Sequence, residues 1–91
     1  MDEKHRLIIE MSNKLIDYCK YSNSRFDVSL YSLYTKIIKN NLVDEANQEF
    51  KELSNYLHES YLRQLESYKQ YFINMYQVHN DNVYLKEKQL R

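Results

Sequence analysis

One apolar stripe runs in helical register from Phe50 to Val83, and it constrains the fold of this chain more than any other feature. At about 100° of rotation per residue its members stay within roughly 140° of one another, the width of one buried helix face. They are Phe50, Leu53, Leu57, Tyr61, Leu65, Tyr68, Phe72, Met75, Tyr76, His79 and Val83. No Gly or Pro interrupts the pattern, because the chain contains neither. The stripe therefore predicts one helix over residues 43–88, roughly 70 Å long at about 1.5 Å per residue.

Two shorter helices are predicted upstream, over residues 2–21 and 27–40. The first carries one apolar stripe, with Ile9 and Ile16 on its far side, so we expect it to lie between more than one neighbour. The second carries Leu30, Leu33, Tyr34, Ile37 and Ile38 at spacings of three and four. Ser and Asn residues at positions 22–24 and 40–41 separate the helices, since short polar side chains compete for backbone hydrogen bonds. We expect Asp44 to cap the third helix.

The predicted fold is all-α: a single domain over residues 1–91, built as a three-helix bundle with a long C-terminal helix. At 43% hydrophobic residues the chain is too apolar to be disordered, but at 91 residues its own core would be thin. The long helix outreaches the two shorter ones, and its uncovered part would expose a large apolar patch. We therefore expect a homodimer through Leu65, Tyr68, Phe72, Met75, Tyr76 and His79. The alternative, in which this part folds back on its own chain, stays open at the level of sequence.

The sequence offers no catalytic, metal or cofactor site. His5, His58 and His79 lack a second ligand at the i, i+4 spacing typical of helical metal sites. Cys19 is the one cysteine and lies on the apolar stripe of its helix, so we expect an inert buried thiol and no internal disulfide. No stretch approaches the roughly 20 apolar residues that span a bilayer. A cytoplasmic protein that is not an enzyme, without cofactor and without membrane contact, is expected.

Three tyrosines off the centre of the stripe, Tyr56, Tyr71 and Tyr84, are the predicted partner-binding residues, because exposed Tyr is enriched at interfaces. The predicted function is protein–protein interaction by a small regulator, adaptor or inhibitor. Abundant Lys, Asn, Tyr and Ile, which have AT-rich codons, are compatible with a phage or mobile-element origin. Nucleic acid is not the expected partner, because 13 basic residues balance 13 acidic ones. The alternative is a dimeric nucleic-acid-associated regulator in which Lys36 and Lys39 contact phosphates.

Overall fold

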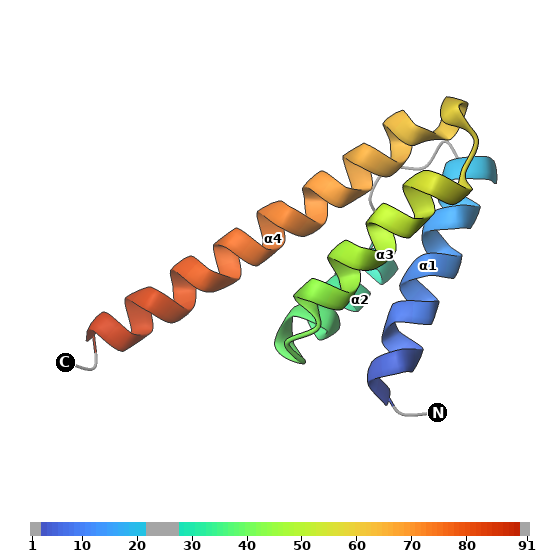
Figure 1. The fold of residues 1–91 in the computed structure, drawn as a ribbon. Helices are drawn as coiled ribbons and strands as arrows, with labels where there is room; N and C mark the ends of the chain where they lie inside the picture. Colours follow the sequence, from blue (N-terminus) through green and yellow to red (C-terminus); the bar gives the residue numbers. More distant parts are fainter. Residues whose placement is uncertain (1–2, 22–27, 90–91) are drawn as a thin grey trace.

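The chain folds into helices packed around one core, as seen in a computed structural model (Figure 1). The structure describes residues 3–21 and 28–89, with side chains up to Asn82. Its elements are α1 (Glu3–Tyr21), α2 (Val28–Lys39), α3 (Val43–Tyr56), the short 3-10 helix η1 (Glu59–Tyr61) and α4 (Leu62–Gln89). No strand occurs within these described ranges, so the predicted all-α class is confirmed.

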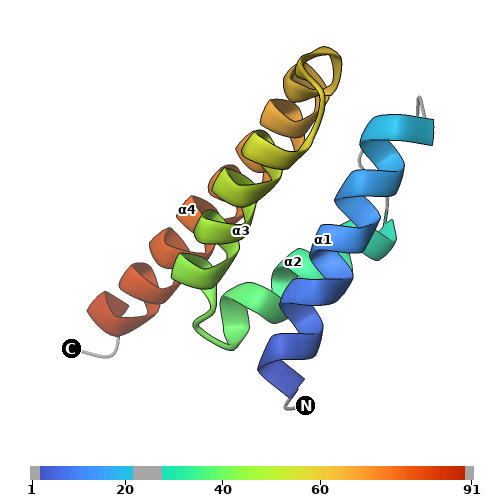
Figure 2. The same cartoon turned by 45° about the vertical axis from the view of Figure 1, so that its right-hand side comes forward.

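The helices form two pairs that run in the same direction, α1 beside α3 and α2 beside α4 (Figures 1 and 2). α1 packs against each of the other three α-helices, which agrees with its predicted position between several neighbours. α4 is the longest element, and its C-terminal end projects beyond the bundle (Figure 1). This projection gives the molecule an elongated outline of 50 × 29 × 22 Å.

The two N-terminal helices match their predicted positions, although residues 2 and 27, their expected first residues, lie outside the described ranges. The stripe expected on α1 is largely buried, through Leu7, Met11, Leu15 and Cys19, while its other members Ile8 and Tyr18 are only partly buried. α2 buries all five of its predicted apolar residues. Ile16, on the far side of α1, also packs partly against the core. Ile9 does not, and it is 41% exposed. A helix with apolar residues on two sides is thus covered on one side and only partly covered on the other.

The α2–α3 turn is a Schellman motif centred on Asn41. Asn41 adopts the left-handed conformation, with φ 58°. The Asn41 N–H donates to the Ile38 carbonyl at 3.1 Å, and the Leu42 N–H donates to the Ile37 carbonyl at 3.0 Å. The predicted break after Asn40 is therefore confirmed. The predicted cap is wrong, because this motif leads straight into α3, which begins at Val43 with Leu42 in the cap position and Asp44 already inside its first turn.

The prediction of one helix over residues 43–88 is wrong, because α3 ends at Tyr56 and the chain turns back. Leu57 and His58 are extended, with ψ 147° and 148°. The His58 Nδ1 then accepts a hydrogen bond from the Ser60 N–H at 3.1 Å and so caps η1. A hairpin points the apolar residues of both its arms at the same core, so the stripe keeps its phase across the turn. Hydrophobic periodicity alone cannot distinguish such a hairpin from one long helix.

The centre of the core is an aromatic cluster of Tyr34, Phe50 and Phe72, drawn from α2, α3 and α4. The Phe72 ring lies edge-on to Tyr34 at a centroid distance of 5.1 Å and tilted to Phe50 at 5.7 Å. The chain buries Leu65 and Tyr68 beside this cluster. Three of the six predicted dimer-interface residues, Leu65, Tyr68 and Phe72, thus lie in the core of a single chain. The other three, Met75, Tyr76 and His79, are half-buried, so the surface left open on α4 is smaller than expected, while homodimerisation itself stays a prediction.

Candidate functional site

The side chains that could react or bind a metal do not cluster in the described part of the chain. Cys19 is buried, and this burial raises the pKa of its thiol to about 11, which disfavours the nucleophilic thiolate. His58 is engaged in the turn before η1. Within the described ranges, no three His, Cys, Asp or Glu side chains are grouped so that they could hold a metal ion. Surfaces for docking, rather than reacting groups, are therefore the candidate functional features.

The predicted partner-binding tyrosines do not form one surface. Tyr56, 67% exposed, lies at the end of α3, where the Lys20 Nζ is 5.6 Å from its ring centroid. Tyr71 lies in the middle of α4 and faces α2. The side chain of Tyr84 falls outside the described part of α4. Tyr56 and Tyr71 consequently belong to different faces of the bundle.

The first candidate surface, the α2–α4 groove, has a volume of about 380 Å³. Its walls are Tyr31, Thr35, Ile38 and Lys39 of α2 and Tyr71, Asn74, Met75, Val78, His79 and Asn82 of α4. The bordering side chains of Tyr31, Tyr71 and Val78 are 54%, 45% and 58% exposed. The groove thus gathers exposed apolar surface from two helices that are separate in sequence.

The α2–α4 groove has two different ends. Because α2 and α4 run in the same direction (Figure 1), Tyr31 and Tyr71 meet at one end, and Lys39 and His79 meet at the other. No Asp or Glu belongs to its lining. Sequence reasoning found Tyr71, Met75 and His79 but missed Tyr31. Tyr31 also lies off the stripe of its own helix, so the criterion applied to Tyr56 and Tyr71 would have selected it.

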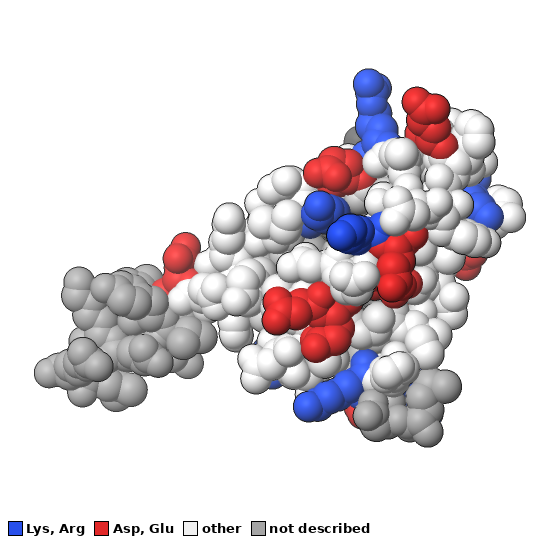
Figure 3. All heavy atoms as spheres, viewed as in Figure 1, with Lys and Arg blue, Asp and Glu red and all other residues white. Residues whose placement is uncertain are grey.

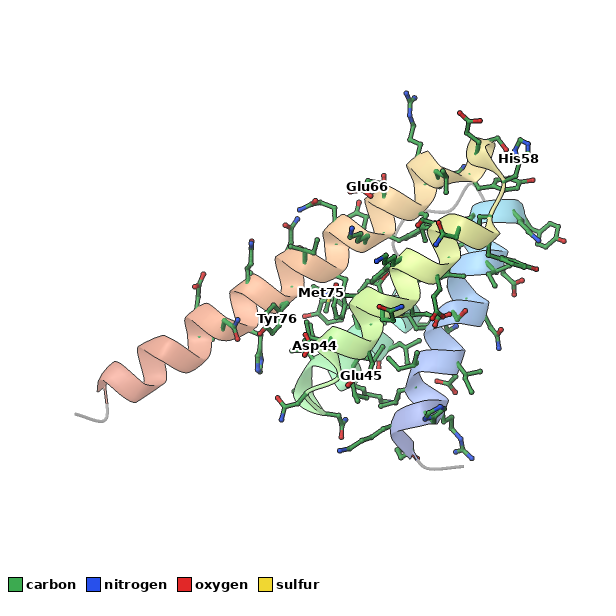
Figure 4. All side chains as sticks on the ribbon, in the orientation of Figure 1. Asp44, Glu45, His58, Glu66, Met75 and Tyr76 are labelled. Atoms are coloured by element: carbon green, nitrogen blue, oxygen red, sulfur yellow. The ribbon has the colours of Figure 1, made fainter. Side chains whose placement is uncertain are left out.

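The second candidate surface, the α1–α3 groove, has a volume of about 620 Å³. Its floor contains Ile8, Ile9 and Leu42, and its α1 wall carries Lys4 and His5. The α3 wall is acidic, with Asp44, Glu45, Glu49 and Glu52 alongside Gln48. Figure 3 shows acidic atoms gathered along α3, and Figure 4 places Asp44 and Glu45 at its start. The groove combines an apolar floor with walls of opposite charge, the more strongly charged of which is negative.

Figure 4 also separates the half-buried end of the predicted dimer interface from the polar face of α4. Met75 and Tyr76 point from α4 toward the side where α3 begins, whereas Glu66 lies on the outer side. Both Met75 and Tyr76 pack partly against the core. Of the predicted interface residues on α4, Met75 and His79 therefore still reach an open groove.

Two further comparisons concern the helices and the chain as a whole. None of the described helices is long and apolar enough to cross a bilayer. No protein-family model, no curated protein and no solved structure matches this chain.

Proposed function

We propose that this chain is a small non-catalytic protein that binds another protein, and that the α1–α3 groove is its docking surface. The observation that carries the proposal is Ile9, which is 41% exposed on the floor of the groove next to the half-buried Ile8. Exposed apolar residues surrounded by charged ones have the organisation of non-obligate interfaces, an apolar centre within a polar rim. Docking there would act by steric occlusion or by stabilising one conformation of the partner.

The acidic wall defines the chemistry of the partner. Glu45, Glu49 and Glu52 follow one another at spacings of three and four, so they line the same side of α3 over about two turns. An amphipathic helix with apolar residues over Ile8 and Ile9, and with Lys or Arg toward α3, complements this arrangement. Helix-in-groove docking uses residues at such spacings, and opposite charges across the rim favour association and orientation.

The experiment is site-specific photo-cross-linking in the native host. A photoreactive residue replaces Ile9, and a matched variant carries it at Gln70, an exposed position of α4 that lines neither groove. We expect a discrete protein adduct from position 9 and none from position 70. Glu49→Lys combined with Glu52→Lys should then lower the affinity for the purified partner by about tenfold, equivalent to about 1.4 kcal/mol.

Two results would contradict this proposal. An adduct that nuclease removes but protease leaves would identify nucleic acid as the partner. An affinity for the purified partner that ignores both the charge reversal and the salt concentration would mean that the α1–α3 groove is not the docking surface.

The nucleic-acid alternative is supported by two exposed lysines, Lys36 and Lys39, on the last turn of α2. Two lysines per chain can displace only about two counterions, so the salt dependence of binding would be shallow unless a dimer doubled their number. Retention on nucleic acid that is lost with Lys36→Ala and Lys39→Ala, while protein binding is unchanged, would favour this second function.

We also propose that the chain forms a homodimer, as expected from the sequence. Leu65, Tyr68 and Phe72 have too little exposed surface to take part, since each is at most 6% exposed. Met75 and His79 remain available in the α2–α4 groove. The dimer therefore needs a different interface from the one that the apolar stripe predicts.

A further inference from the structure

We infer that the α2–α4 groove is the interface between two copies of this chain, which meet antiparallel across a two-fold axis perpendicular to the groove. This interface includes α2, whereas the dimer expected from the sequence used residues of the C-terminal helix alone. The interface uses other helices than the α1–α3 groove, so its test is independent of the proposed docking of another protein.

The lining of the α2–α4 groove is predominantly apolar. Ile38 and Met75 line it, and the exposed Tyr31, Tyr71 and Val78 border it. Its lining contains no carboxylate. Interfaces between identical subunits are more apolar than the average protein surface, whereas interfaces with non-obligate partners are about as polar as that surface. Of the two grooves, the α2–α4 groove therefore suits a second copy, and the charged α1–α3 groove suits a different protein.

The two ends of the α2–α4 groove are complementary to each other, one aromatic and one cationic. Across a two-fold axis perpendicular to the groove, the two grooves face each other in opposite directions. The aromatic end of one groove therefore meets the cationic end of the second. Lys39 of one copy then lies over Tyr31 and Tyr71 of the partner copy, where an ammonium group is attracted to an aromatic face. The same pairing is repeated at the other end of the interface.

Charge repulsion selects the antiparallel arrangement over the parallel one. Lys39 lies eight residues beyond Tyr31, which is about 12 Å along the helix axis. An antiparallel pair separates the two Lys39 side chains by roughly this length, slightly more than the Debye length of about 8 Å at physiological ionic strength. A parallel pair would bring both lysines together with no carboxylate in the groove to neutralise them.

The shape of α4 provides the contact. Val78, 58% exposed, stands on the border of the groove, and Ile38 and Met75 lie within it. Val78 of each copy can enter the groove of the other copy. The two-fold axis makes these two contacts identical. The patch is about as long as α2, which is roughly 18 Å. We expect a weak dimer, because a patch of this length falls below the standard interface size.

Sedimentation equilibrium from micromolar to millimolar concentration tests the interface. We compare Val78→Glu with Gln77→Glu, which adds the same charge at the adjacent exposed position, one that lines neither groove. The wild type should form dimers as its concentration rises. Val78→Glu should weaken the dimer by about tenfold or more, because the charge would be desolvated. Gln77→Glu should change the dissociation constant less than about twofold. Circular dichroism verifies that both variants remain folded.

A wild type that stays monomeric up to millimolar concentration overturns the inference. So does a dimer that both variants weaken equally, or that neither variant weakens, because the interface would then lie elsewhere.

A spin label tests the orientation. It is attached to Asn82→Cys, at the cationic end of the groove, in a Cys19→Ala background. These copies are mixed with isotopically labelled wild-type copies, and the broadening of amide signals is measured. In the antiparallel dimer the broadened amides are those of Tyr31 and Tyr71. Broadening centred on Lys39 and His79 would mean a parallel dimer and would overturn the inference.

Discussion

The Tyr34 hydroxyl ties α2 to α4 through a buried hydrogen bond. It donates to the backbone carbonyl of Tyr68 at 3.0 Å, and the Tyr34 side chain is 0% exposed. Burial is also the main reason why the pKa of Tyr34 lies far above its ordinary value. A buried hydroxyl is costly unless it is hydrogen-bonded, so this contact fixes where along α4 the ring of Tyr34 must lie.

Removing this hydroxyl should destabilise the chain without changing its fold. Tyr34→Phe keeps the ring that packs on Phe72 at 5.1 Å and deletes the donor to the Tyr68 carbonyl. We expect the free energy of unfolding in urea to fall by about 1 kcal/mol. Tyr56→Phe is the matched control, because that side chain is 67% exposed, and its free energy of unfolding should change little. Equal effects from both variants would argue against the buried bond.

Cys19 makes the stability of the fold sensitive to alkaline pH. Burial raises the pKa of its thiol from 9.0 to about 11. Below pH 9.0 both the folded and the unfolded chain hold this proton. Above it the unfolded chain loses the proton first, so stability should fall as the pH rises from 9.0 to about 11.

Cys19→Ala isolates this contribution from the lysines and tyrosines that titrate in the same range. We expect urea midpoints of the wild type to fall more steeply between pH 9 and pH 11 than those of the variant. Parallel curves would show that the thiol ionises equally easily in both states.

At the scale of elements, the α3–α4 turn shows what an apolar pattern can and cannot predict. The end of α2 follows from Asn40 and Asn41 at a change of stripe phase. The turn at Leu57 and His58 also has Ser54 and Asn55 nearby, but the stripe passes through it without a change of phase. The turn carries a local interaction, the Ser60 N–H donating to the His58 ring, and no periodicity encodes such a contact.

The same limit applies to the grooves. The stripe of α4 predicted Met75 and His79 as surface that another chain could cover, and both line the α2–α4 groove. Tyr31 could have been selected as an off-stripe tyrosine, but its place in the same groove as Tyr71 depends on how the α3–α4 hairpin places α4 against α2. Ile9 was recognised as lying off the main stripe of α1, but its partner wall on α3 again depends on packing.

His58 should be replaceable only by another residue that accepts a hydrogen bond. His58→Ala removes the acceptor for the Ser60 N–H, and we expect a loss of about 1 kcal/mol in the free energy of unfolding. His58→Asn retains a side-chain acceptor and should stay close to the wild type. The measurement is chemical denaturation of both variants, and an alanine variant as stable as the asparagine one would mean that the ring contributes no cap.

At the scale of the whole molecule, a single chain closes its own core. Phe72, 1% exposed, lies among aromatic rings contributed by α2 and α3. The arrangement places Leu65, Tyr68 and Phe72 of the expected interface in the core and leaves the α1–α3 and α2–α4 grooves as surfaces for association. Folding and association should therefore be separable by mutation.

Phe72→Glu tests this separation. It places an unpaired charge at the centre of the core, where the cost is several kcal/mol, and we expect an unfolded chain rather than a folded monomer. Phe72→Ala should lower the free energy of unfolding by about 3–5 kcal/mol. Circular dichroism and urea denaturation measure both. A folded, monomeric Phe72→Glu variant would show that Phe72 serves association instead of the core.

The apolar stripe that keeps its phase across Leu57 and His58 has one further consequence. If these two residues became helical, α3 and α4 would join into a rod that presents the same side chains on one side, and α4 of each chain could occupy the place of α4 in a second chain. Such an exchange would keep the stripe of α4 in a core and change only the segment around the hinge, which is the geometry of domain swapping. We therefore expect substitutions that favour a helical Leu57 and His58 to promote exchange of α4 between chains.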